Sequence, residues 1–180
     1  MTDSVILKHH SDLDDVREEL IKVYASVRGD LLHLPNYRVE TFTERLDRHG
    51  NDPGWEAVMA HAPEGEPIGY AYANTVEPGN RWWTRMDAPP PAEYASSTSL
   101  AIKEIGVAKP WRGQGLAQAM HDELLRHRHE EYVTLLVNPA AGEGKVKRLY
   151  EGWGYVQIGR QQPSPDSPPL HCLGRPVVQP

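Results

Sequence analysis

The stretch that decides the fold is Ile105-Gly106-Val107-Ala108-Lys109-Pro110-Trp111-Arg112-Gly113-Gln114-Gly115-Leu116-Ala117. The run that leads into it, 99–107, predicts a strand. The residues that follow it carry apolar side chains at helical spacing, with Leu116, Met120 and Leu124 in one row. The sequence therefore predicts a strand, a short turn and a helix in direct succession.

The turn carries two glycines, Gly113 and Gly115, immediately before the predicted helix. A glycine-rich turn that opens a helix exposes backbone N–H groups without partners, and these groups favour a phosphate. Because glycine has no side chain, a ligand can also approach the backbone closely. Arg112 adds a guanidinium that can hold a phosphate through two donors. The turn is thus predicted to bind a phosphate or pyrophosphate.

Two segments of the chain resemble one known family. Arg112–Ala117 resembles the R/Q-x-x-G-x-G/A signature of the GCN5-related N-acetyltransferases (the GNAT superfamily). Leu149–Tyr155 resembles the L-Y-E-x-x-G-F/Y segment of the same family, and the two motifs stand in the family's order. The resemblance implies acetyl-CoA as the cofactor, with its pyrophosphate held by Arg112, Gly113, Gln114, Gly115, Leu116 and Ala117.

The pattern of elements predicts a mixed α/β fold, with strands at both ends of a strand–helix–strand–helix centre. The resemblance implies the GNAT fold, a central and mostly antiparallel sheet with a splayed parallel strand pair, flanked by helices. A chain of 180 residues is most simply a single domain, 1–180. Its last residues, 176–180, are predicted to be a frayed tail.

Glu104 is the candidate general base. Strict alternation along the strand places it on the same face as Leu100 and Ile102, so we expect it to be partly desolvated. An attacking amine must lose a proton, because an alkylamine is mostly charged at neutral pH. The resemblance supports this role, since many members of the family carry a working Glu on this strand. The alternative is a structural role, in which Glu104 forms an ion pair with a nearby Arg or with Lys103.

Tyr150 is the candidate general acid, which would protonate the CoA thiolate as it leaves. The resemblance implies this role, because the family's tyrosine in this segment points toward the CoA sulfur. The alternative is a core aromatic in the apolar row that Val146, Leu149 and Trp153 form.

The resemblance also implies cofactor contacts that use backbone atoms. In the family, the pantetheine arm pairs with the free edge of the splayed strand, which implicates the main chain of Ile105 and Val107. Asn138 ends the following strand and is placed to meet the pantetheine amides. The segment after Asn138 is longer and richer in glycine than the family's commoner pattern.

The segment 77–97 is predicted to be a long loop on the substrate side, because it has no periodicity and contains three consecutive prolines. Its paired tryptophans, Trp82 and Trp83, either line a substrate pocket or cover a sheet edge. Tyr70 and Tyr72, on one face of an earlier strand, are the other candidates for substrate binding.

Composition and motif spacing argue against several other classes of protein. The net charge of −6 argues against a general nucleic-acid surface. No apolar run approaches the length of a membrane span, residues 1–4 lack the apolar segment of a secretion signal, and the one cysteine, Cys172, suits a reducing compartment. A cytoplasmic protein is therefore expected. No cluster has the spacing of metal ligands, and the third glycine of a dinucleotide-binding fingerprint is replaced by Gln118.

Together these features predict an acetyl-CoA-dependent N-acetyltransferase. It would move an acetyl group to a primary amine by direct attack in a ternary complex, with a small-molecule or peptide amine as the acceptor. The alternative is a GNAT-fold module that binds acyl-CoA without catalysis, as a sensor or partner protein. Many relatives dimerise, so the resemblance also raises the expectation of a homodimer.

Overall fold

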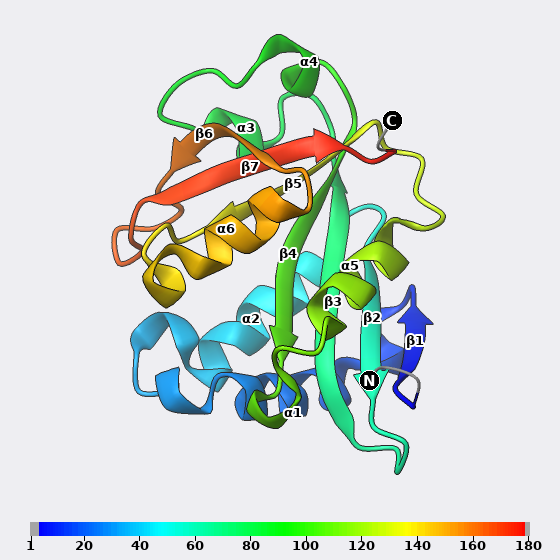
Figure 1. The fold of residues 1–180 in the computed structure, drawn as a ribbon. Coiled ribbons are helices and arrows are strands. Elements are labelled where there is room, and N and C mark those ends of the chain that lie inside the picture. Colours follow the sequence, from blue (N-terminus) through cyan, green and yellow to red (C-terminus); the bar gives the residue numbers. More distant parts are fainter. Residues whose placement is uncertain (1–3, 179–180) are drawn as a thin grey trace. The chain divides into compact units, whose positions relative to one another are not determined.

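The computed structural model describes residues 4–178, and its strands form a seven-stranded mixed sheet in the order β1-β2-β3-β4-β5-β7-β6 (Figure 1). Neighbouring strands are antiparallel in the pairs β1–β2, β2–β3, β5–β7 and β6–β7, whereas β4 and β5 run parallel. The parallel pairing joins Ser99–Ile102 to Tyr132–Leu135 and ends there, although both strands continue. The predicted mixed α/β fold with one parallel strand pair is confirmed.

The chain divides into two compact units, 1–74 with 103–128 and 75–102 with 129–180. The longer strands β3 and β4 contribute to both units. The first unit contains β1 (Ile6–His10), α1 (Arg17–Val27), α2 (Val39–Gly50), β2 (Glu56–His61), most of β3 (Pro67–Val76), the end of β4 (Ser99–Val107) and α5 (Leu116–Leu125), with short 3-10 turns at Leu13–Asp15, Gly29–Leu31, Pro35–Tyr37 and Lys109–Trp111. The second contains α3 (Arg81–Thr84), α4 (Ala92–Ala95), β5 (Tyr132–Val137), a 3-10 turn at Ala141–Gly144, α6 (Lys145–Gly152), β6 (Val156–Gln161) and β7 (Leu170–Pro176).

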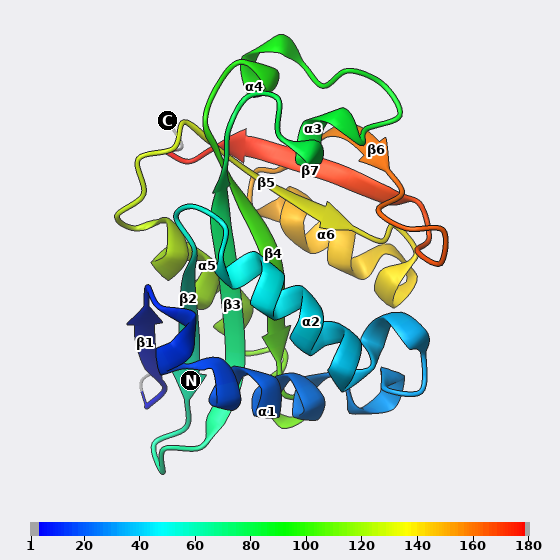
Figure 2. The same ribbon diagram turned by 180° about the vertical axis from the view of Figure 1, so that it is seen from behind.

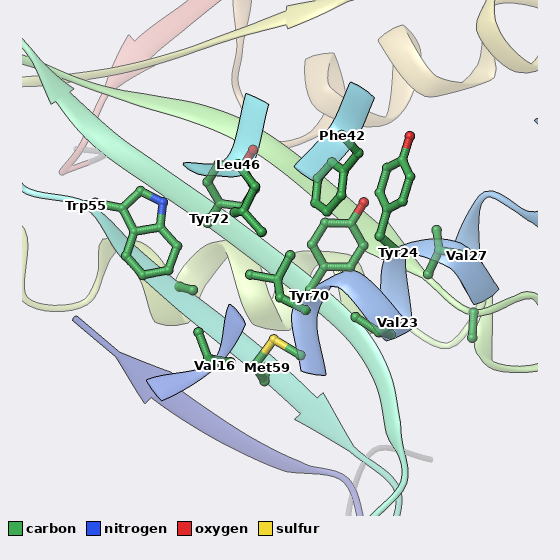
Figure 3. Close-up of a cluster of buried hydrophobic side chains, with 13 residues drawn as sticks. Val16, Val23, Tyr24, Val27, Phe42, Leu46, Trp55, Met59, Tyr70 and Tyr72 are labelled. Atoms are coloured by element: carbon green, nitrogen blue, oxygen red, sulfur yellow. The ribbon is translucent and has the colours of Figure 1, made fainter. Parts of the chain in front are cut away.

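In the first unit, α1 and α2 cover one face of β2 and β3 (Figure 2). Their apolar rows meet in a cluster of buried side chains, in which Tyr24 and Phe42 stack with ring centroids 3.7 Å apart (Figure 3). The rings of Tyr70 and Tyr72, from β3, complete this cluster from the sheet side. Because Tyr24 and Phe42 are fully buried, the helical spacing seen in the sequence is explained by this packing.

The opposite face of β3 carries small residues, where the sequence leaves room for a helix. A Cβ built on Gly69 would lie 3.1 Å from Cε of Met120, a residue of α5. Helix α5 is therefore packed closely on this face, and it places the turn that precedes it at the end of β4.

The second unit has its own buried cluster, to which the segment 77–97 contributes. This segment is not one open loop, because it contains the short helices α3 and α4. Trp82 and Trp83 are buried and pack with Met86, Tyr94 and Cys172. The Trp82 indole donates to Oγ1 of Thr134 on β5 at 3.3 Å, and β5 is an internal strand of the sheet, so this contact is not at a sheet edge.

Part of the predicted tail, residues 176–178, lies within the described residues. Pro176 ends β7, and the amide of Val177 donates to the carbonyl of Glu131 at 3.0 Å. Residues 179–180 of the predicted tail lie outside the described residues, as do residues 1–3 at the other end. Across 4–178, none of the helices combines the length and the apolar character that a membrane crossing requires.

Candidate active site

The glycine turn keeps its backbone open. Gly113 and Gly115 have φ angles of 76° and 79°, a conformation that residues with a side chain rarely adopt. A Cβ at either position would meet nothing within 4 Å. The turn therefore requires glycine for its backbone shape, and not to avoid a neighbouring side chain.

Gly115 is also the N-cap of α5, and no side chain caps this helix. The first N–H groups of a helix have no partner within it, so they can donate hydrogen bonds to an external anion. Leu116, the first residue of α5, is buried and anchors the turn to the unit. An exposed turn before a helix without a side-chain cap is the geometry expected for a phosphate-binding loop.

Arg112 is exposed, and its guanidinium also contacts the backbone beneath the turn. Its Nε donates to the carbonyl of Val107 at 2.9 Å and its Nη2 donates to the carbonyl of Val27 at 3.0 Å. The side chain thus ties the end of β4 to the end of α1 beneath the turn. These two contacts use Nε and one hydrogen of Nη2, and a guanidinium has five N–H donors. They fix the position of the turn, and the predicted contact of Arg112 with a phosphate stays a prediction.

Glu104 lies at the centre of a charged cluster, which we call the Glu104 cluster: Glu104, Arg28, Arg45 and Tyr70. Its Oε1 is 3.1 Å from Nη2 of Arg45, and its Oε2 is 3.4 Å from both Nη2 of Arg28 and the Tyr70 hydroxyl. The Glu104 side chain is only 13% exposed. The Glu104 carboxylate is partly desolvated, as expected for a general base. It also forms the ion pair with an arginine that was considered as its alternative, structural role.

The tyrosines around this carboxylate stay protonated. Burial raises the pKa of Tyr70 well above its usual value, and the negative charge of Glu104 raises it further. The pKa of Tyr72 is raised for the same two reasons in the same order. The Tyr70 hydroxyl can therefore donate a hydrogen bond to Glu104 at any physiological pH.

His49, at the end of α2, is a neutral neighbour of this cluster. Burial first, and then the positive charges of Lys103, Arg48 and Arg45, lower the pKa of His49 from 6.5 to about 3. Its Nδ1 lies 3.0 Å from the Tyr72 hydroxyl. An uncharged imidazole thus lies among several cations in the first unit.

Arginine side chains contact two backbone carbonyls of β4, in the residues to which the resemblance assigns cofactor contacts. The carbonyl of Ile105 accepts from Arg28 Nη2 at 3.4 Å, and the carbonyl of Val107 accepts from Arg112 Nε at 2.9 Å. Between them, Gly106 is packed tightly, since a Cβ there would lie 2.7 Å from the Tyr70 ring and 2.8 Å from Val27. The role of this backbone in cofactor binding stays a prediction.

The other predicted site residues belong to the second unit. Tyr150 lies on α6, with its ring edge-on to Trp153 at 5.1 Å and to Tyr155 at 5.9 Å between centroids. Oδ1 of Asn138 accepts from the amide of Ala140 at 3.0 Å, so this side chain closes the turn after β5. Neither geometry tests the predicted cofactor contacts, which stay predictions.

The four rings predicted to bind substrate are all core residues in this structure. Tyr70 and Tyr72 are fully buried, and Trp82 and Trp83 are less than a tenth exposed. Each ring packs in the buried cluster of its own unit. Their burial gives them a structural role, and substrate contact stays a prediction.

Sequence reasoning did not find Arg28, Arg45, His49 or Gly106. Arg28 and Arg45 are 76 and 59 residues from Glu104 in the chain, so no local motif links them. Gly106 could have been noticed, because it is a glycine inside a predicted strand, which often marks a close approach. Among the described residues, no group of three or more His, Cys, Asp or Glu side chains could hold a metal ion.

Comparison with known proteins gives one family. The model of the acetyltransferase (GNAT) family matches residues 15–155. No curated protein matches the chain.

Solved structures share the fold at low sequence identity. A GNAT-family protein from Desulfovibrio desulfuricans, described as a putative acetyltransferase, has a TM-score of 0.66 at 15% identity, over 97% of this chain and 99% of that one. The NatC complex bound to Gag peptide and CoA contains a chain with a TM-score of 0.64 at 16% identity, over 97% and 99%. NAA60 of Arabidopsis thaliana in complex with acetyl-CoA has a TM-score of 0.63 at 18% identity, over 96% and 98%.

Proposed function

Because the chain belongs to the acetyltransferase (GNAT) family, we propose that it transfers an acetyl group from acetyl-CoA to a primary amine by direct attack. The observation that carries the proposal is the open turn, in which Gly113 and Gly115 present the uncapped start of α5. Two of the structural neighbours, NatC and NAA60, are described as bound to CoA or acetyl-CoA. The residues of this turn fit a diphosphate, because they offer backbone donors without side chains in the way.

The proposed reaction forms one bond and breaks another. The amine nitrogen, once deprotonated, attacks the thioester carbon; the C–N bond forms and the C–S bond breaks. The sulfur leaves with the electron pair and takes a proton, so that an ammonium and acetyl-CoA give an amide, CoA thiol and one released proton. Acetyl-CoA supplies the activated acyl group, and the protein's residues supply binding, orientation and proton transfer.

Glu104 is the proposed base in this reaction. Its carboxylate can accept the ammonium proton directly or through one water, and Tyr70 fixes its orientation by a hydrogen bond at 3.4 Å. Tyr150 is the proposed acid, on the strength of the Leu-Tyr-Glu segment that carries it. The predicted backbone contacts of Ile105 and Val107, and the amide contact of Asn138, belong to the same proposal.

A second candidate function follows from the ion pairs of Glu104. Two guanidinium groups face this carboxylate, and ion pairing of this kind is compatible with a structural role in place of a catalytic one. The chain would then bind acyl-CoA without turnover, as a sensor or partner protein. The two functions differ in one measurement, the release of CoA thiol in the presence of an amine.

The test is a thiol-release screen of acetyl-CoA against a library of primary amines, together with calorimetric titration of CoA. We expect CoA to bind and at least one amine to be acetylated. Glu104→Gln should lower kcat/KM by about 10²-fold or more, within the range of general base catalysis, while CoA still binds. Glu19→Gln is the matched control, because it removes a carboxylate paired with His61 at 2.6 Å in the same unit. CoA binding without turnover of any amine would support the non-catalytic function, and absence of CoA binding would contradict both.

A further inference from the structure

The Glu104 cluster has more positive than negative charge. Arg28 and Arg45 both face Glu104, and among the described residues no second carboxylate lies within ion-pair distance of either guanidinium. Two more cations, Arg48 and Lys103, act on His49 beside the cluster. This local excess occurs in a chain whose net charge is −6. The excess of positive charge around Glu104 is therefore a local feature of the site and does not follow from the overall composition.

The two guanidinium groups do not exhaust their donors on Glu104. Arg28 donates through Nη2, to Glu104 and to the carbonyl of Ile105, both at 3.4 Å. Arg45 uses Nη2 for Glu104 and Nη1 for the carbonyl of Asn36 at 3.4 Å. Neither forms the two parallel hydrogen bonds that a guanidinium makes with a carboxylate at its best. Donors remain on both side chains, and each side chain is 27% exposed.

Burying part of a guanidinium without a full set of hydrogen-bond partners costs desolvation free energy. The cost is offset when a ligand brings a second anion, because a planar carboxylate matches the planar fork of Arg. Glu104 lies 3.1 Å from one of these forks and 3.4 Å from the other, and it remains the one group of the cluster that attracts an ammonium. The cluster thus offers recognition of both a carboxylate and an amine on the same molecule.

We propose that the acceptor is a small amine that carries a carboxylate a few atoms from the reacting nitrogen, as an amino acid does, with Arg28 and Arg45 holding the carboxylate and Glu104 facing the amine. This inference rests on the proposed acetyl transfer and names its substrate class. It places cationic amines without a carboxylate, such as polyamines, among the poor acceptors, because the same guanidinium groups repel them.

Matched pairs of acceptors isolate the contribution of the carboxylate. Each pair consists of an amino acid and the amine that remains after its carboxylate is removed: phenylalanine with 2-phenylethylamine, leucine with isopentylamine, and lysine with 1,5-diaminopentane. We expect kcat/KM to be at least about tenfold higher for the amino acid in at least one pair, the scale of one charge-assisted contact. Calorimetric binding of the two members to the wild-type protein should show the same preference.

The variants Arg45→Gln and Arg28→Gln should reduce the ratio of the two kcat/KM values within each pair to near unity. If the two residues had a purely structural role, the variants would lower kcat/KM for both acceptors of a pair by the same factor. Arg45→Lys keeps the charge and loses the planar fork, so it should give an intermediate ratio. Arg17→Gln is the control, because Arg17 of α1 forms an ion pair with Asp47 of α2 at 2.6 Å and is not part of the cluster. This variant should leave the ratio of kcat/KM values unchanged.

The inference is overturned if the amine without a carboxylate is bound and acetylated equally well or better in every pair. It is also overturned if no amino acid of the panel is bound or acetylated although CoA binds. A protein that binds the amino acids through Arg45 and does not bind CoA would instead remove the proposed transferase function and keep the recognition of the carboxylate.

Discussion

The glycine turn and the Glu104 cluster lie in the same unit, but they are built in opposite ways. The turn owes its proposed anion site to backbone atoms, and glycines at two neighbouring positions leave those atoms exposed. The cluster owes its character to side chains from α2, β3, β4 and the end of α1, which are distant in the chain. The comparison teaches that a site of local backbone geometry can be read from a short motif, and a site of assembled side chains cannot.

The largest expected effect tests the backbone side of this comparison. Gly115→Leu should weaken CoA binding at least about 100-fold, because a side chain would occupy the open face and distort the turn. Gly65→Leu is matched to it, since Gly65 has a φ of 95° and equally open surroundings in the same unit. Both variants should lose about 1–2 kcal/mol of stability from the left-handed backbone. Calorimetry of CoA with both variants checks this, and equal binding would remove the turn from the cofactor site.

The next largest effect tests whether a residue outside the Glu104 cluster, Tyr150, takes part in proton transfer. Tyr150→Phe should lower kcat by about 10²-fold with little change in CoA affinity, because it removes only the proposed acidic hydroxyl. Tyr155→Phe is the control, because it removes a hydroxyl from the ring that lies edge-on to Tyr150. Steady-state kinetics with a saturating amine measures the difference, and unchanged turnover of Tyr150→Phe would show that the leaving sulfur needs no acid from this residue.

A smaller effect tests the strand that connects the cluster and the turn. Gly106→Ala should destabilise the protein by about 1–3 kcal/mol, because its Cβ would lie 2.7 Å from the Tyr70 ring and 2.8 Å from Val27. Gly29→Ala should be close to neutral, since a Cβ there meets nothing within 4 Å. Denaturant unfolding of both variants gives the comparison. Equal stability would mean that β4 can shift to accommodate the methyl group.

The smallest effect concerns the pH dependence of stability. The pKa of His49 is lowered from 6.5 to about 3 in the folded protein by burial, so the unfolded chain binds the proton more tightly. The stabilisation from a neutral His49 is therefore present above about pH 6.5 and is lost progressively as the pH falls toward about 3. The loss between about pH 7 and about pH 5 should be on the order of 1 kcal/mol after allowance for partial exposure.

His49→Gln should reduce this pH dependence, although it also costs the hydrogen bond to Tyr72 at all pH values. His33→Gln, at an exposed position in the same unit, is the control. Thermal unfolding at several pH values compares the three proteins. A wild-type protein whose stability changed no more than that of His49→Gln would contradict the burial of a neutral imidazole.

Much of the fold and part of the site could be predicted from the sequence, for a specific reason. Helical rows such as Leu20 and Tyr24 on α1, or Leu116 and Met120 on α5, are periodic because one face of each helix is buried. The left-handed φ of Gly113 and Gly115 is equally local, so the motif indicates the turn directly. The family match over residues 15–155 confirms the family that the two motifs predicted.

The sequence by itself determined the succession of strand, glycine turn and helix, since each depends on residues that are neighbours in the chain. Only the tertiary structure decided where Arg112 points, because its donors find the carbonyl of Val27, 85 residues away. The tertiary structure also decided the partners of Glu104, since Arg28 and Arg45 come from segments that folding alone brings to β4. The physical reason is that ion pairs and hydrogen bonds between distant segments leave no periodic pattern in the sequence, whereas burial of a helix face and a left-handed glycine do.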